Sequence, residues 1–214
     1  MARTKNPRTR ALLVERAAQM LARREPVTLR ALVAGTEVST MAVYTYFDGI
    51  DGLWRAVRQE GFIRLAAELA TVGATADPVR DLTALGAGYL ANALANPDLY
   101  RVMFDATADL EDAASADATL GLLVTAVARA RDAGRFAPET NPEVIALRVW
   151  VIGHGLASLV ATGPLPVEVL ANGEPMLVAL FVAAGDEPER CARSVARGWR
   201  PEPEPRTGPE PDRV

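Results

Sequence analysis

The chain of 214 residues is poor in cysteine, histidine and aromatic residues, with one Cys, one His and 6% Phe, Trp and Tyr together. Because Cys191 is the single cysteine, an intrachain disulfide is excluded and a cytoplasmic location is expected. A single histidine, His154, excludes metal sites built from several histidines, and we expect no metal or cofactor. No stretch reaches the about 18 uncharged apolar residues of a membrane span, and the basic N-terminus lacks the apolar core of a signal peptide.

Alanine, leucine, valine and arginine dominate the composition, which favours helices over strands. The formal net charge is −4, yet residues 1–60 hold ten basic and six acidic residues and so carry +4, which leaves −8 for the rest. A basic head on an acidic body is typical of a protein whose head meets a polyanion. The alternative interpretation is a basic segment that is merely solvated.

The first 60 residues show two short helices between longer ones. Apolar residues recur at three- and four-residue spacing over residues 8–24, as in an amphipathic helix, which Pro26 ends. Thr28 is the predicted N-cap of a two-turn helix, and Ser39 is predicted to cap a second short helix that ends near Phe47. A short helix, a tight turn and a second short helix form a helix-turn-helix.

The second short helix is expected to expose hydroxyl and phenol groups. If Ala42, Val43 and Phe47 face the helices behind it, short polar residues and tyrosines form its outer side. Such groups suit phosphate oxygens and base edges in a major groove. Alternatively, the tyrosines only hold the small domain together, and Ser and Thr are plain caps. With the basic arm of residues 1–10, the predicted DNA-binding residues are Arg3, Lys5, Arg8, Arg10, Thr28, Ser39, Thr40, Met41, Tyr44, Thr45 and Tyr46.

The spacing of caps and aromatic residues in this region also matches a known motif. The matching positions are Thr28-Leu29, Leu32, Val38-Ser39, Val43-Tyr44, Tyr46-Phe47 and Leu53. Residues 8–60 thereby resemble the DNA-binding domain of TetR-type (TetR/AcrR) transcriptional regulators. Glu37 replaces the usual turn glycine, which predicts a strained or altered turn, and Ile50 replaces a usual lysine, which removes one phosphate contact. The basic arm can compensate by reaching phosphates or an adjacent minor groove.

Residues 61–185 are predicted to form a larger helical domain for ligand binding and dimerisation. The segment 142–163 is apolar almost all round, so it should be buried by its own domain on one side and by a second subunit on the other. With the helix at 176–184 it would form half of a four-helix dimer interface, as a two-fold reader of a palindrome needs. The predicted interface residues are Val151, Gly155, Ser158, Leu177, Leu180 and Phe181.

The stretch from Trp150 to Gly155 reads WVIGHG and resembles the Trp-His-Gly (WHG) regulatory domain of one branch of the TetR-type regulators. Trp150 and His154 share a helix face, so they can line an effector pocket in which His154 forms hydrogen bonds. The alternative is a core histidine satisfied by a neighbouring helix. The predicted ligand-binding residues are Tyr89, Tyr100, Met103, Phe104, Trp150 and His154.

Residues 186–214 are predicted to be a largely disordered tail, because Pro-Glu repeats lack hydrophobic periodicity. Cys191 would be an isolated, exposed thiol in this tail. No serine has a histidine partner in a known motif and no Gly-rich phosphate loop follows a strand, so the chain is not expected to be an enzyme.

The sequence therefore predicts an all-α protein with an N-terminal three-helix helix-turn-helix head and a larger C-terminal regulatory and dimerisation domain. The resemblance implies a ligand-responsive homodimeric repressor that binds a palindromic operator in double-stranded DNA and is released by a small, mostly apolar effector. Two alternatives stay open. One is a helical ligand-binding protein of the same fold with weak or lost DNA binding, and the other is an enzyme that uses His154 as a general base.

Overall fold

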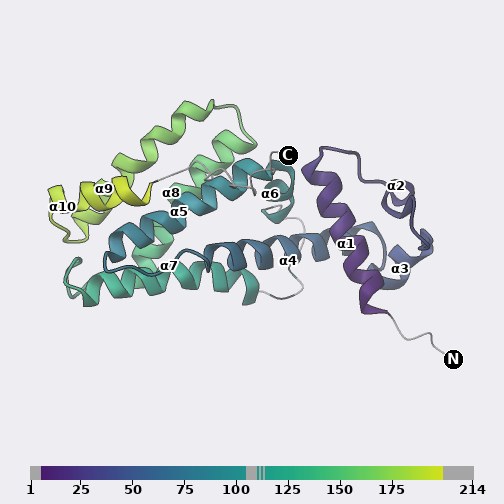
Figure 1. Ribbon diagram of the computed structural model, residues 1–214, viewed down its shortest axis with the longest axis horizontal. Coiled ribbons are helices and arrows are strands. Elements are labelled where there is room, and N and C mark those ends of the chain that lie inside the picture. The colour runs from purple at the N-terminus through teal and green to yellow at the C-terminus, as the bar shows by residue number, and fades with distance from the viewer. Residues whose placement is uncertain (1–5, 105–109, 111, 113, 200–214) are drawn as a thin grey trace, which may run out of the picture.

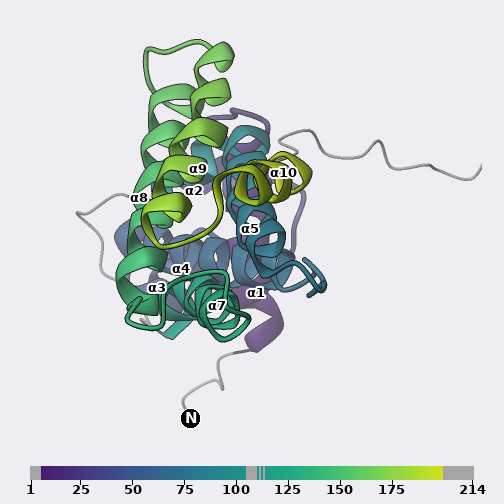
Figure 2. The same ribbon diagram turned by 90° about the vertical axis from the view of Figure 1, so that its left-hand side faces the viewer.

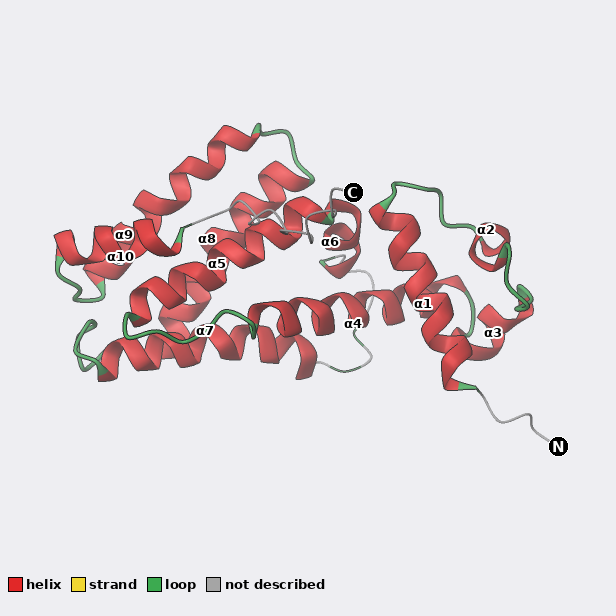
Figure 3. Ribbon diagram, viewed as in Figure 1, coloured by secondary structure: helices red, strands yellow, loops and turns green. Residues whose placement is uncertain are grey.

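The computed structural model describes residues 6–104, 110, 112 and 114–199. These residues form helices and loops without a strand (Figure 3), which confirms the all-α prediction. The elements are α1 (Pro7–Ala22), α2 (Leu29–Val33), α3 (Met41–Phe47), α4 (Ile50–Leu69), α5 (Pro78–Ala95), α6 (Pro97–Met103), α7 (Ala114–Asp132), α8 (Pro142–Ala161), the 3-10 helix η1 (Val167–Asn172), α9 (Gly173–Ala183) and α10 (Pro188–Gly198).

The molecule has a small head and a larger body, and helix α4 belongs to both (Figure 1). The head contains α1, α2, α3 and the first turns of α4, while the body contains the rest of α4 and the helices that follow. Helix α4 packs on α1 and α3 near its beginning and on α6 and α7 further along. Its 20 residues span about 30 Å at the usual helical rise. One rigid element therefore connects the two parts.

Side-chain caps explain where several helices begin. Thr28 accepts a hydrogen bond from the backbone N–H of Ala31 at 3.2 Å, which confirms it as the N-cap of α2. Asn6, Asp77 and Asn141 cap α1, α5 and α8 in the same way, and a proline follows each of the three. A capping side chain replaces a partner that the first backbone N–H groups lack, and proline at the first position loses no bond.

Helix α3 is an exception to this pattern. It begins at Met41, with Thr40 in the cap position and no side-chain cap bond, so the prediction of Ser39 as its cap is wrong. At its other end Asp48 has φ 60° and Gly49 has φ 108°, which turn the chain sharply into α4. A Cβ at Gly52 would lie 1.6 Å from the carbonyl oxygen of Phe47, so only glycine permits this close approach of α3 and α4.

The body is built around α5, which packs against α4, α6, α7, α8 and α10. Figure 2 shows α8 and α9 side by side on one flank, with α7 below them and α10 in front of α5. Large side chains such as Leu82, Leu90, Met103, Leu177 and Phe181 are fully buried between these helices. Burial of each such side chain contributes about 1.5–3 kcal/mol to folding.

Helix α10 corrects the prediction of a disordered tail for residues 188–198, whereas the prediction for residues 200–214 lies outside the described residues. Residues Pro188–Gly198 are helical and pack on α5 and α9. The buried stripe of this helix consists of Cys191, Ser194, Val195 and Gly198, at helical spacing but mostly of small size. A Cβ at Gly198 would lie 2.4 Å from the carbonyl oxygen of Arg80, so α10 approaches α5 very closely. Small residues permit this contact but give a weak hydrophobic signal in sequence.

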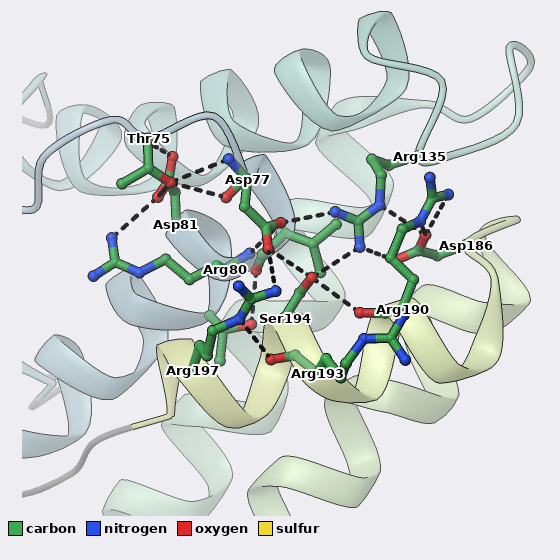
Figure 4. A network of polar contacts seen from close by, with 12 residues as sticks. Thr75, Asp77, Arg80, Asp81, Arg135, Asp186, Arg190, Arg193, Ser194 and Arg197 are labelled. Carbon is green, nitrogen blue, oxygen red and sulfur yellow. Dashed lines mark hydrogen bonds and ion pairs between the residues drawn. The ribbon is translucent and has the colours of Figure 1, made fainter.

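A network of ion pairs fixes α10 to the body (Figure 4). Arg135, in the loop after α7, donates to both carboxylate oxygens of Asp186 at 2.9 and 2.7 Å and to Asp77 at 2.7 Å. Ser194 of α10 donates to Asp77 at 2.7 Å. Burial disfavours the charged form of Arg135, but its bonds to Asp186 and Asp77 outweigh this and raise its pKa. The network joins α5, the end of α7 and α10.

Cys191 lies inside this arrangement and is buried, which corrects the prediction of an exposed thiol. Burial raises its pKa to about 12, with Asp186 adding to the effect. The thiol is therefore protonated at neutral pH, and a protonated thiol is a poor nucleophile.

Helix α8 is, within the described residues, long and apolar enough to cross a membrane by length and composition alone. One side of α8 packs against α5, α7 and α9, so the apolar residues on that side belong to the core of the body. Its other side exposes Val144, Leu147, Val151 and Leu159. An exposed apolar stripe of this kind usually marks a contact surface.

The ion-pair network leads to a stability prediction. Replacement Arg135→Met leaves the carboxylates of Asp186 and Asp77 without their main partner, and Asp186 is buried. Removing one partner of a buried pair leaves an uncompensated charge, so we expect a loss of about 3 kcal/mol in the free energy of unfolding. Urea denaturation measures this loss.

The matched control is Arg193→Met on the solvent side of α10, where Arg193 and its partner Glu189 are exposed and 3.8 Å apart. Exposed pairs contribute little, so this variant should unfold at nearly the same urea concentration as the parent protein. Equal stability of the two variants would show that the network does not hold α10.

Candidate functional site

The inner face of α3 is fixed by contacts within the head. Val43 and Phe47 are buried, and the guanidinium of Arg10 lies 5.5 Å from the centroid of the Phe47 ring. Arg16 of α1 donates to the backbone carbonyls of Ala31 at 3.3 Å and Ala34 at 2.8 Å. These bonds hold α1 to the end of α2. The end of α2 and the inner face of α3 are therefore both held in place, and so is the orientation of α3.

The turn between α2 and α3 corrects the expectation of strain at Glu37. Positive φ occurs at Gly35, at 70°, and not at Glu37. Thr36 donates to the carbonyl of Val33 at 2.7 Å and accepts from the N–H of Val38 at 3.2 Å. Glycine therefore stands where the left-handed conformation is needed, and a threonine hydroxyl closes the turn.

The outer face of α3 carries the side chains predicted to read DNA. Met41 is 65% and Tyr44 53% exposed, and Thr45 is exposed beside them. Ser39 is exposed and Thr40 half-buried just before the helix, while Thr28 is exposed at the start of α2. Large exposed side chains gathered on one short helix are typical of a contact surface. The structure brings these residues to one face of the head.

Two predicted DNA-binding residues, Tyr46 and Arg10, are placed differently. Tyr46 is half-buried, and its hydroxyl accepts a hydrogen bond from the N–H of Asn6 at 2.9 Å, so it holds the beginning of α1. Arg10 packs on Phe47, whereas Arg8 is exposed in the first turn of α1. Arg3 and Lys5 lie outside the described residues. Ile50, at the position of the usual lysine, packs against the core.

Sequence reasoning did not single out Arg55 as a functional residue. Together with Tyr44, Asp48 and Gly52, it lines an open hollow of about 490 Å³ beside α3. Its position in α4, eight residues after Phe47, places a cation next to the exposed face of α3. The count of basic residues included Arg55, but only the geometry shows that it lies beside this helix.

In the body, four polar side chains converge between α5, α6 and α8, and we call them the tyrosine-histidine cluster: Tyr89, Tyr100, His154 and Ser158. The hydroxyls of Tyr100 and Tyr89 lie 2.7 and 2.9 Å from Nδ1 of His154 and 3.2 Å from one another. Ser158 lies 3.2 Å from the Tyr100 hydroxyl and 3.4 Å from Nε2 of His154. His154 is thus satisfied by neighbouring helices, as the core-histidine interpretation expects.

Every group in the tyrosine-histidine cluster is uncharged at neutral pH. Burial lowers the pKa of His154 and raises those of Tyr89 and Tyr100. We assign the histidine proton to Nε2, because Tyr100 then donates to Nδ1, Tyr89 and Ser158 donate to Tyr100, and Nε2 donates to Ser158. This assignment uses each hydroxyl hydrogen once and leaves no donor unused.

Aromatic rings surround the cluster. The ring of Trp150 stacks on His154 with centroids 5.2 Å apart, and Phe104 lies 4.5 Å from His154 and 4.8 Å from Tyr100. Met103 is buried against α4, where a Cβ at Gly61 would come within 2.6 Å of it. Five of the six predicted ligand-binding residues therefore lie together, and Met103 supports α6 from the α4 side.

Next to the cluster lies a small, partly enclosed cavity of about 20 Å³, room for about one water molecule. Its lining is apolar apart from Tyr89 and Thr119, and it consists of Leu69, Leu85, Gly86, Tyr89, Thr119, Leu123, Val149, Trp150 and Gly153. A Cβ at Gly86 would meet nothing within 4 Å, so no other side chain fills the space next to this glycine. Sequence analysis missed Leu85, Gly86 and Leu123, because they look like ordinary core residues.

The structure places the predicted dimer residues in three different environments. Val151 is 57% exposed on α8, and Gly155 and Leu180 are half-buried. Leu177 and Phe181 are fully buried inside the chain, which corrects their assignment to a subunit interface. Ser158 belongs to the tyrosine-histidine cluster. The outward face of α8 and α9 is instead completed by exposed Leu147 and Met176.

Comparisons with known proteins agree with this architecture. Residues 82–183 match the family model of the Tetracyclin repressor-like, C-terminal domain. Solved structures of TetR-family proteins are among those with the same fold. The chain therefore has the fold of TetR-type regulators, and residues 82–183 belong to the family of their C-terminal domain. The more specific resemblance to the Trp-His-Gly domain stays a prediction.

Three solved structures show how similar this chain is to known proteins. A protein of unknown function from Rhodococcus sp. RHA1 is 26% identical, with a TM-score of 0.62 over 87% of this chain and 95% of its own. RolR in complex with resorcinol is 15% identical, with a TM-score of 0.64 over 89% and 94%. AibR in complex with isovaleryl coenzyme A and operator DNA is 20% identical, with a TM-score of 0.55 over 80% and 97%. No curated protein matches the chain.

The single histidine of the chain gives a specific pH prediction. The pKa of His154 in the folded state lies below its ordinary value of 6.5, so the unfolded state takes up the proton first as the pH falls. The free energy of unfolding should be constant above about pH 7 and decrease as the pH falls through about 6.5 toward 5.

Urea denaturation between about pH 7.5 and 5.5 measures this slope, since few other groups titrate in that window. The variant His154→Gln keeps a hydrogen-bonding side chain but has no proton to gain, so its stability should be flat over the same range. A slope that persists in the variant would mean that another group causes it.

Proposed function

We propose that this TetR-type regulator is a homodimeric repressor that reads a palindromic operator with α3 and is released by a small, mostly apolar effector bound in the body. The observation that carries the proposal is the exposed outer face of α3 on a helix fixed from behind by Val43 and Phe47. A fixed helix with an exposed face of hydroxyl, phenol and thioether groups suits a major groove.

The DNA-binding proposal assigns different roles to the residues around α3. Met41, Tyr44 and Thr45 contact base edges, while Ser39, Thr40 and Thr28 contact phosphates or sugars. Arg8 and Arg55 add attraction to the phosphate backbone that does not depend on sequence. Arg10, Arg16 and Tyr46 hold the head together. The operator DNA present in the AibR complex supports this use of the fold.

The proposed effector site is the cavity beside the tyrosine-histidine cluster, between α4, α5, α7 and α8. The RolR and AibR structures contain resorcinol and isovaleryl coenzyme A, respectively, which supports a role of the fold in binding small molecules. A ligand larger than one water must widen this cavity. It can shift the protein toward the widened conformer only by binding that conformer more tightly.

The proposed subunit contact is the apolar stripe of α8 with the outward side of α9. Leu147 and Val151 are 48% and 57% exposed, and Met176 of α9 is 45% exposed. Two copies of this surface facing each other would bury the stripe and form a four-helix contact with two-fold symmetry. A two-fold pair of heads reads half-sites one helical turn, about 34–36 Å, apart.

We propose no catalytic role for this protein. His154 is the candidate general base, but its Nδ1 accepts a hydrogen bond from Tyr100, the hydroxyl of Tyr89 lies 2.9 Å from the same atom, and Trp150 and Phe104 pack around the ring. A base in this position must first break these bonds to take a proton from a substrate.

The test of DNA reading is selection of bound sequences from a random duplex pool, followed by a salt titration of the selected site. We expect a palindrome whose affinity falls steeply with salt. The variants Met41→Ala and Tyr44→Ala each remove an exposed contact from α3 and should weaken binding to that site by about tenfold or more.

The matched control for these variants is Val167→Ala, which removes an apolar side chain of similar exposure from the body. It should bind the selected duplex as the parent protein does. No enriched sequence from a folded dimer would sink the DNA-reading proposal and favour the alternative of a ligand-binding protein that has lost DNA affinity.

The subunit contact is tested by Val151→Glu, which places a charge in the middle of the apolar stripe. A buried unpaired carboxylate is costly, so the variant should sediment as a monomer while the parent protein sediments as a dimer. The control is Ile63→Glu on α4, where a residue of similar exposure lies outside the stripe. A dimer that survives Val151→Glu would place the contact elsewhere.

A further inference from the structure

We propose that the effector is a neutral hydroxylated aromatic molecule whose hydroxyl group joins the tyrosine-histidine cluster and whose ring occupies the widened cavity beside Trp150. This inference rests on the proposed function, because it names the chemical class for the effector site in the body. Three observations carry it: the hydrogen-bond pattern of the cluster, the lack of charge around the cavity and the aromatic and glycine walls.

The hydrogen-bond pattern selects a group that both donates and accepts. The hydroxyl groups of Tyr89 and Tyr100 form a hydrogen bond 3.2 Å long. A ligand hydroxyl inserted there accepts from Tyr89 and donates to Tyr100, so it replaces the direct bond between the tyrosines and each hydroxyl hydrogen still has an acceptor. A carbonyl group accepts but cannot donate, and a hydrocarbon does neither. A site built from hydroxyl partners strongly rejects an analogue that leaves them unpaired.

The charge pattern excludes acids and bases. The nine residues that line the cavity carry no ionisable side chain apart from the Tyr89 phenol. The histidine of the adjoining cluster is held in its neutral form by burial, which lowers its pKa. A carboxylate in this cavity has no cation to pair with, and transfer of an unpaired charge from water into an apolar site is unfavourable.

The shape of the walls favours a flat ring. Gly86 of α5 and Gly153 of α8 both line the cavity, and neither presents a side chain to it. The aromatic side chains of Trp150 and Tyr89 also line the cavity. Leu85 and Leu123 complete the apolar lining. A planar aromatic molecule slides between such walls with less displacement than a branched aliphatic one, and it stacks favourably on the rings.

The geometry also relates binding to the proposed release from DNA. Tyr100 lies on α6, next to Met103, and Met103 fits against Gly61 of α4. Arg58 of α4 donates to the carbonyl of Met103 at 2.7 Å. A hydroxyl that separates Tyr89 from Tyr100 pushes α6 away from α5, and α6 is fixed to α4. Since α4 supports α3, the displacement reaches the head.

The test uses three probes that share one ring and alkyl group: 4-ethylphenol, 4-ethylbenzoate and ethylbenzene. Phenol and 2-naphthol extend the hydroxyl series to smaller and larger rings. Isothermal titration calorimetry with the full-length protein should show binding of at least one hydroxyl probe. The best hydroxyl probe should bind at least about tenfold more tightly than 4-ethylbenzoate and ethylbenzene.

Variants then locate the binding site. Tyr100→Phe removes the acceptor of the ligand hydroxyl, and His154→Gln removes the ring nitrogen that orients Tyr100, so each should weaken the best hydroxyl probe by about tenfold and leave ethylbenzene unchanged. The control Thr125→Val removes a hydroxyl of α7 that bonds only within its own helix, to Gly121, and should bind as the parent protein does. Thermal unfolding of each variant shows whether it is folded, and Ser158→Ala replaces any variant that is not.

Each remaining outcome has one meaning. Two results overturn the inference. One is binding of 4-ethylbenzoate or ethylbenzene as tight as that of the hydroxyl probes. The other is that no hydroxyl probe binds at about 1 mM, which means that each binding free energy is weaker than about −4 kcal/mol. The DNA selection on the same preparation separates the two proposals. A selected operator without probe binding removes only the effector class, whereas probe binding without a selected operator removes only the DNA-reading function.

Discussion

The rest of the structure depends on the constraint that one helix, α4, is shared by the head and the body. Its first turns approach α3 so closely that Gly52 has no room for a side chain, and nine residues later Gly61 gives the same close approach to Met103 of α6. Two glycines in one helix weaken its intrinsic stability, and close packing on both sides offsets this. The head therefore cannot change its angle to the body unless α4 or α6 moves.

Polar interactions in the body serve two different ends. The network around Arg135 and Asp186 is charged and paired, so it holds separate chain segments in one arrangement. The tyrosine-histidine cluster is neutral and consists of hydroxyl groups that exchange partners at small cost. A fixed charged network and an adaptable neutral cluster in the same domain leave the cavity as the place where the body changes most easily.

Much of the fold could be predicted from the sequence because helical spacing, caps and prolines are local signals. Thr28, Pro78 and Pro142 mark helix starts that the structure places at the expected positions. The sequence-based predictions failed where contacts between distant parts of the chain determine the structure. Helix α10 has a stripe of small residues, and its order depends on Arg135, which lies over fifty residues earlier. The outward or inward direction of Leu177 in an apolar helix is likewise set by its neighbours and not by its own sequence.

The position of α10 late in the chain has a consequence for folding during synthesis. The helices of the head, which are α1, α2, α3 and the first turns of α4, are all synthesised before the helices of the body. The body cannot pair Asp77 with Ser194 until α10 has been made. Domains fold as units from the N-terminal end during synthesis. The nascent protein therefore contains the helices of the proposed DNA-reading head before the body, which is proposed to control it, has closed.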